Sequence, residues 1–180
     1  MVGLRKAASY SKKYTVPYTR KSKKKNKSYI KAVPPQIVVK FTMGSENDFN
    51  KGKYPFQMTM ITTEKIQIRS NAIEASRQYI NRKLDEKYPA QYFFRVLPYP
   101  HHIQRENKML TGAGADRMQT GMQLSFGKTV GRAALLKSDA PIFFLAMQNK
   151  KAEQYARELL HKIKAKLPCT TRILTEQIKG

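Results

Sequence analysis

The sequence predicts an α+β fold in which two amphipathic helices cover a mostly antiparallel sheet. Residues 56–62, with the sequence FQMTMIT, alternate apolar and polar side chains, which is typical of a half-buried strand. Between Ala152 and Leu167 apolar residues recur at the spacing of one helix face, and a similar stripe begins at Ile73. Short strands are expected before, between and after these helices, an order typical of α+β domains. A chain of 180 residues is long enough for one such domain with a sizeable core.

The expected elements follow in order along the chain. The first helix is expected to begin with Ser70 as its N-cap and to end near Tyr88, where a proline follows. The second is expected to begin at Asn149 and to end before Pro168. Strands are expected at 36–43, 56–62, 65–69, 92–97, 133–137, 141–147 and 172–175, with a polar loop at 44–52.

The charge balance points to a polyanionic partner. The chain has 35 Lys and Arg against 12 Asp and Glu, which gives a formal net charge of +23 and a pI near 10.2. A membrane surface is also polyanionic, but the sequence has no apolar run of about eighteen residues and no apolar signal-peptide segment at its N-terminus. The single cysteine, Cys169, predicts no internal disulfide and no disulfide-linked partner, consistent with a reducing cytosol. We therefore expect a nucleic acid rather than a membrane as the partner.

Residues 1–35 are expected to form a basic extension that binds RNA. Residues 1–31 contain eleven Lys or Arg, and the first acid of the chain is Glu46. Tyrosines that offer stacking surface for bases are interleaved with these cations: Tyr10, Tyr14, Tyr18 and Tyr29. The alternative is a solvated tail whose tyrosines pack on the domain. Two prolines at 34–35 end the extension, because proline restricts both its own φ and the preceding residue, and residues 36–180 are expected to form one domain.

A long functional loop is expected at about 101–132. This stretch holds five of the nine glycines, which weaken helices and strands, together with several cations. It does not fit a dinucleotide-binding G-x-G-x-x-G fingerprint, because the third glycine position after Gly112 and Gly114 is Arg117. It does not fit a phosphate-binding P-loop either, since the required first glycine falls on Met122.

The amino-acid sequence of this loop is similar to a known family signature. Residues 105–122, RENKMLTGAGADRMQTGM, are followed by FGK and VG. This run resembles the signature of the archaeal and eukaryotic large-subunit ribosomal protein ten-e, a family that includes bacterial ribosomal protein L sixteen. Collinear similarities cover most of the chain: PYTRK at 17–21, IQIRSNAIEASR at 66–77, YPHHIQRENK at 99–108 and KLPCTTRI at 166–173. The resemblance implies the α/β-hammerhead fold of that family and a structural role in the large subunit of the cytoplasmic ribosome.

The resemblance also implies the partners. It places the protein on large-subunit rRNA near the peptidyl transferase centre and close to 5S rRNA, beside other large-subunit ribosomal proteins, where its arrival supports late subunit maturation. Charge and motif predict a set of rRNA-binding cations: Arg5, Lys6, Lys12, Lys13, Arg20, Lys21, Lys23, Lys24, Lys25, Lys128 and Arg132. The family implies that the loop reaches toward the acceptor region of tRNA, with these residues near it: Arg105, Asn107, Lys108, Met109, Gly112, Gly114, Asp116 and Arg117.

No catalytic site, metal site or cofactor is expected. His101 and His102 are adjacent, so on an extended chain they point to opposite faces, and the only other histidine is His161. Glu106 and Asp116 flank the loop tip and offer oxygen ligands for magnesium, but salt bridges to the neighbouring arginines explain them more simply. We find no carboxylate pair or oriented histidine of the kind that an RNA-cleaving enzyme needs.

A non-ribosomal RNA-binding or RNA chaperone protein remains the alternative. Such a protein shares the charge and the basic extension, but it does not require the loop sequence at 105–122. Sedimentation of the chain away from ribosomal subunits would favour this alternative.

Overall fold

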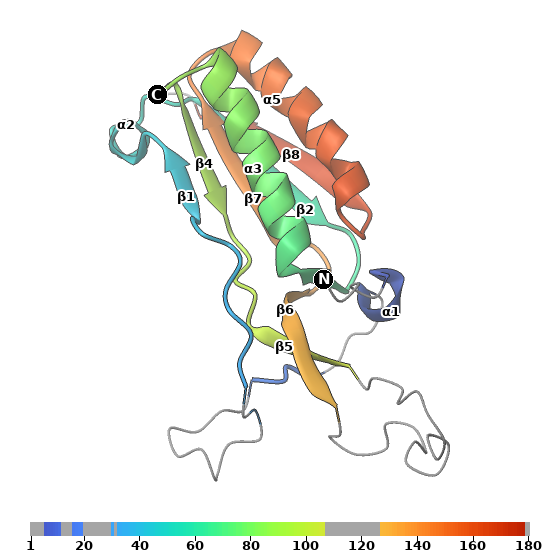
Figure 1. Ribbon diagram of the computed structural model, residues 1–180. Helices are drawn as coiled ribbons and strands as arrows, with labels where there is room; N and C mark the ends of the chain where they lie inside the picture. The colour runs from blue at the N-terminus through green and yellow to red at the C-terminus, as the bar shows by residue number, and fades with distance from the viewer. Residues whose placement is uncertain (1–5, 12–15, 20–29, 31, 107–126, 179–180) are drawn as a thin grey trace, which may run out of the picture.

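The computed structural model describes residues 6–11, 16–19, 30, 32–106 and 127–178, which form two antiparallel sheets (Figure 1). The α+β prediction is confirmed, although the expected single sheet is divided in two. The larger sheet has the order β1 (Thr42–Gly44), β4 (Tyr92–Val96), β7 (Pro141–Met147), β2 (Phe56–Thr62) and β8 (Thr171–Gln177). The smaller sheet has the order β3 (Ile66–Arg69), β6 (Lys128–Leu136) and β5 (His102–Glu106).

Two long helices cover one face of the five-stranded sheet, and the three-stranded sheet lies beyond its end (Figure 1). These helices are α3 (Ser70–Lys87) and α5 (Lys150–Ile163), and the 3-10 helix η2 (Lys164–Lys166) continues α5. Two short helices complete the described elements: α1 (Ala8–Ser11) and α2 (Glu46–Asn50).

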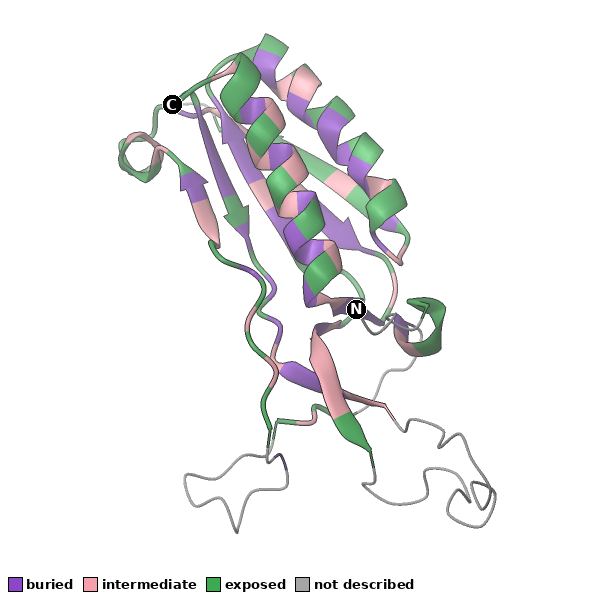
Figure 2. Cartoon of the chain, in the orientation of Figure 1, coloured by how far each residue is buried: buried purple, intermediate pink, exposed green. Residues whose placement is uncertain are grey.

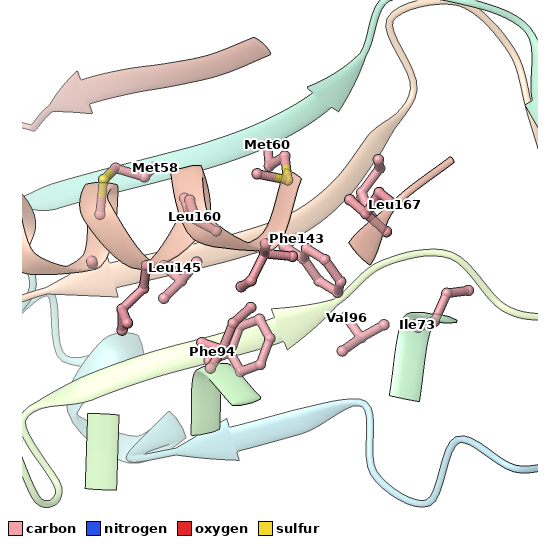
Figure 3. Close-up of a cluster of buried hydrophobic side chains, with 14 of the residues drawn as sticks. Met58, Met60, Ile73, Phe94, Val96, Phe143, Leu145, Leu160 and Leu167 are labelled. Carbon is pink, nitrogen blue, oxygen red and sulfur yellow. The ribbon is translucent and has the colours of Figure 1, made fainter. Parts of the chain in front are cut away.

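The hydrophobic core lies between the two long helices and the sheet. Figure 2 shows that each helix buries the side that faces the sheet and exposes the other. In Figure 3, Met58 and Met60 of β2 lie near Phe143 of β7 and Leu160 of α5. The stripe predicted for the second helix is buried as expected: Ala152, Ala156, Leu159, Leu160, Ile163 and Leu167. Burial of each large apolar side chain stabilises the fold by roughly 1.5–3 kcal/mol.

A glycine with positive φ ends β1. Gly44 has a φ of 84°, and a Cβ atom added there would lie 2.1 Å from the carbonyl oxygen of Tyr92. The backbone N–H of Ser45 donates to that same oxygen at 3.0 Å. Only a residue without a side chain allows the two backbones to approach so closely.

The strand expected at 36–43 is wrong except at its end, because only Thr42–Gly44 pairs as β1. The antiparallel register sets Thr42 opposite Arg95. If that register continued, Ile37 and Val39 would lie opposite the prolines at 100 and 98, which have no N–H to donate. The ladder therefore stops, although the β-branched residues favour a strand.

Further boundaries differ from the sequence prediction. The polar loop expected at 44–52 contains α2, which Ser45 caps: its Oγ accepts from the N–H of Asp48 at 3.4 Å. The first long helix includes Ser70 as its first residue, so the predicted N-cap is wrong by one position, and Arg69 occupies it without a side-chain capping bond. The final strand is longer than the expected 172–175.

The loop expected at 101–132 is shorter than predicted, because β5 and the first half of β6 lie inside it. These two strands pair despite Gly131, which lies opposite Gln104, and a register shift between Gln104 and Arg105 accommodates the irregular ladder. The short strand expected at 133–137 is thus the second half of a nine-residue strand.

Candidate nucleic-acid interface

The small sheet carries both ends of the segment at 107–126. Glu106, the last residue of β5, lies opposite Lys128, the first residue of β6. The chain therefore leaves and re-enters the sheet at neighbouring positions. The glycine-rich part of the predicted tRNA-proximal loop is attached to a paired ladder rather than to a long irregular connection.

The N-terminal segment is hydrogen-bonded to the edge of β5. The N–H of Tyr18 donates to Nδ1 of His102 at 2.9 Å, and the N–H of Ile103 donates to the carbonyl oxygen of Tyr18 at 3.1 Å. Burial, with smaller contributions from His101 and Arg105, lowers the pKa of His102 to about 4. His102 is thus neutral near pH 7, and its Nδ1 is an acceptor. The buried side chain of His102 therefore packs in the small sheet and fixes the N-terminal segment along its edge.

Two tyrosines of the extension pack on arginines of the small sheet. The guanidinium of Arg69 lies 4.6 Å from the ring centroid of Tyr10, and that of Arg105 lies 4.5 Å from the ring centroid of Tyr18. The hydroxyl of Tyr10 also donates to the carbonyl oxygen of Arg105 at 3.4 Å. At these two positions the alternative reading, tyrosines that pack on the domain, holds. Tyr14 and Tyr29 lie outside the described residues.

The end of the extension is held against β6. Thr129 Oγ1 donates to the carbonyl oxygen of Ala32 at 2.7 Å, and Arg132 Nε donates to that of Pro34 at 2.7 Å. Arg132 Nη1 also donates to the hydroxyl of Tyr99 at 3.4 Å. Arg132, which charge and motif placed in the predicted RNA-binding set, therefore also links the extension to the domain.

Few of the predicted site residues fall within the described ranges. Lys6 and Lys128 are exposed, whereas Arg105 and Arg132 are half-buried. The remaining predicted rRNA-binding residues lie outside the described part of the chain: Arg5, Lys12, Lys13, Arg20, Lys21, Lys23, Lys24 and Lys25. The same is true of seven predicted tRNA-proximal residues: Asn107, Lys108, Met109, Gly112, Gly114, Asp116 and Arg117.

Three cations on α3 are paired with carboxylates. Arg77 Nη2 lies 2.6 Å from Glu74 Oε1, and this hydrogen-bonded guanidinium is the main reason that the pKa of Glu74 is lowered. Arg82 and Lys83 both contact Glu86, at 3.0 and 2.7 Å. Arg77 is thus nearly buried in its ion pair, whereas Arg82 and Lys83 are neutralised by Glu86 on the exposed side of the helix.

Sequence reasoning missed the contacts that join the small sheet to its surroundings. Gln104 donates through Nε2 to Oε1 of Gln67 between β5 and β3, and both side chains are buried. A buried polar pair of this kind leaves no periodic signal, since isolated glutamines in strands are usually solvated. The described ranges contain neither a cluster of three potential metal-ligating acids, histidines or cysteines nor a helix long and apolar enough to cross a membrane.

Comparison with known families explains the conspicuous loop sequence and the surrounding fold. The model of the family described as ribosomal protein L16p/L10e matches residues 17–174. The chain belongs to this family. The resemblance predicted from the sequence is therefore confirmed.

Archaeal relatives align over most of their length. The chain is 40% identical over 175 residues to the large ribosomal subunit protein uL16 of Thermofilum pendens, covering 97% of this chain and 98% of that protein. It is 40% identical over 172 residues to the protein of the same name from Sulfolobus acidocaldarius, covering 94% of this chain and 92% of that protein. It is also 40% identical over 158 residues to the protein of the same name from Saccharolobus islandicus, and this alignment covers 87% of this chain and 83% of that protein. These relatives are ribosomal proteins rather than enzymes, in agreement with the prediction that the chain is not an enzyme.

Proposed function

We propose that the chain is a structural protein of the large ribosomal subunit, which acts in the cytoplasm by binding large-subunit rRNA. The observation that carries this proposal is the nearly full-length identity of 40% to relatives named for that subunit. The net charge of +23 supports it, because such a charge favours assembly on a polyanion. Binding rests on phosphate neutralisation and counterion release, so it weakens as salt rises.

The finer part of the proposal concerns where on the large subunit the protein binds and what its loop approaches. The protein binds rRNA near the peptidyl transferase centre and 5S rRNA, beside neighbouring large-subunit proteins, and the segment at 107–126 is directed toward the acceptor region of tRNA. The exposed Lys6 and Lys128, together with the half-buried Arg132, are the described residues that the proposal assigns to rRNA. The β5–β6 ladder supports the loop assignment, since it gives the loop a rigid base.

Quantitative mass spectrometry across a high-salt sucrose gradient tests the assignment to the ribosome. The chain is expected to co-sediment in stoichiometric amount with known large-subunit proteins. Recovery with free RNA or near the top of the gradient would refute the proposal and favour the RNA chaperone alternative.

A loop variant tests the tRNA assignment separately. A chain with Lys108→Gln and Arg117→Gln is expected to enter the large subunit normally and to reduce tRNA binding and peptidyl transfer to puromycin. The matched control is Lys150→Gln with Lys151→Gln, which removes two charges at the start of α5. Equal tRNA binding in the two variants would contradict the loop assignment.

A further inference from the structure

The chain that leaves β4 has an exposed face made of alternate residues. Arg95, Leu97 and Tyr99 are exposed, whereas the residues between them and Pro100 are buried. An extended chain with this alternation presents every second side chain on the same side. At Arg95 this side is the face of the five-stranded sheet away from the helices, because the adjacent Phe94 lies in the core under them.

Tyr99 is an aromatic platform held in one orientation. The residue is 53% exposed, and its ring lies 5.8 Å from the ring of Phe41, centroid to centroid, at an interplanar angle of 31°. Arg132 holds the hydroxyl end. The prolines at 98 and 100 fix the backbone on both sides, so little conformational entropy is lost when a ligand stacks on the ring.

Cations flank this ring without carboxylate partners. The guanidinium of Arg95 makes no hydrogen bond or ion pair with any described residue, and Arg132 leaves its Nη2 group without one among them. Arg95 and Tyr99 lie roughly 13 Å apart along an extended chain that rises ~3.3 Å per residue. By contrast Arg82, which is also exposed, contacts Glu86 at 3.0 Å.

An exposed ring between two guanidinium groups that have no carboxylate partner among the described residues fits one class of partner. Bases offer π faces of their own, and the phosphates that join them are anionic, so unpaired RNA satisfies both features of the strip. A paired RNA stem satisfies only the charges, because its bases are already stacked on each other. An acidic peptide likewise has no obligatory ring to place on Tyr99.

We propose that Tyr99, Arg95 and Arg132 form a binding site for an unpaired RNA nucleotide. The base stacks on the Tyr99 ring beside Leu97, and the two guanidinium groups contact the phosphates on either side. This inference rests on the proposed function, which supplies RNA as the partner, and it assigns an RNA-binding role to two residues, Arg95 and Tyr99, that charge and motif did not single out.

Binding of the full chain to two RNA probes, measured by fluorescence anisotropy over a series of salt concentrations, tests the site. The probes are an unpaired oligouridylate of about eight nucleotides and a blunt RNA duplex. Tyr99→Leu is expected to weaken binding to the unpaired probe about tenfold at every salt concentration and to leave duplex binding within about twofold. Tyr99→Phe, which keeps the ring, is expected to bind both probes like the wild type.

The charge at Arg95 has a matched control in Arg82. Both substitutions to Gln remove one positive charge from an exposed arginine, so the net charge of the two variants is the same. Arg95→Gln is expected to reduce the slope of log K against log salt for the unpaired probe by about 0.7, whereas Arg82→Gln leaves it unchanged. Circular dichroism melting of each variant checks that the fold is intact.

Two results would overturn the site. One is equal binding of the unpaired probe by folded Tyr99→Leu and wild type, and the other is an identical salt slope for Arg95→Gln and Arg82→Gln. Sedimentation is measured on the wild type, so it tests the ribosomal assignment separately. If the wild type co-sediments with the large subunit but either of these two binding results is obtained, only the nucleotide site is refuted. A wild type that fails to co-sediment would refute the ribosomal assignment itself.

Discussion

Two glycines with similar backbone torsions separate backbone strain from close contact. Gly44 has a φ of 84° and Gly52 a φ of 74°, so alanine is strained at both. An alanine in the left-handed region costs roughly 1–2 kcal/mol. At Gly52 nothing lies within 4 Å of the added Cβ, whereas at Gly44 the carbonyl oxygen of Tyr92 lies 2.1 Å away. We expect Gly52→Ala to lower the free energy of unfolding by about 1 kcal/mol.

Gly44→Ala must also move β1 away from β4, and displacement of packed backbone adds roughly 1–3 kcal/mol. We therefore expect a total loss of about 3 kcal/mol for this variant. Urea unfolding followed by circular dichroism measures both values, and an unchanged m-value shows that the same surface is exposed on unfolding. Equal losses in the two variants would show that the close approach of β1 and β4 is not the constraint that requires glycine at Gly44.

Three further outcomes follow from the described contacts. Because the pKa of His102 is lowered from 6.5 to about 4, the unfolded chain takes up this proton first on acidification, so up to about 3 kcal/mol of stability is lost as pH falls from 6.5 to 4. Urea titrations should show that His102→Asn, whose amide oxygen can still accept, lacks this part of the pH dependence. Arg77→Met strands the buried Glu74 carboxylate and is expected to cost about 3 kcal/mol at pH 7 in urea unfolding. Adding Glu74→Gln should recover most of that loss, and no recovery would contradict the pairing. Phe143→Ala is expected to cost about 3–5 kcal/mol in the same measurement, and Phe144→Ala, at a half-buried site, clearly less; similar costs would argue against the core assignment.

The periodic elements could be predicted from the sequence, whereas the interruptions could not. The stripe from Ala152 to Leu167 is buried as predicted, since helical spacing and burial on a sheet are directly connected. The strand expected at 36–43 was wrong because strand propensity describes one chain, while pairing depends on the partner. Here the partner contains prolines at 98 and 100, and no local pattern in 36–43 reports them.

The candidate site shows the same division. Charge and motif selected Lys128 and Arg132 as candidates, but charge alone did not separate arginines that pair with a carboxylate from those that do not. Arg82 precedes Glu86 by four residues on α3 and contacts it, whereas Arg95 lies on β4, in a stretch from 87 to 105 that contains no acid. The attachment of the extension through Tyr18 and the buried histidine was also invisible, because it joins residues that lie 84 positions apart.

The pairing of Glu106 with Lys128 has a consequence for how the chain can change over time. Once an antiparallel ladder holds two stems together, the entropy of closing the segment between them grows only with the logarithm of its length, and doubling that length costs about 0.6 kcal/mol. Loop-closure entropy therefore sets only a weak limit on the length of the segment between 107 and 126. Selection for what this segment binds can change its length at little cost in closure entropy, because the paired stems keep its two ends together.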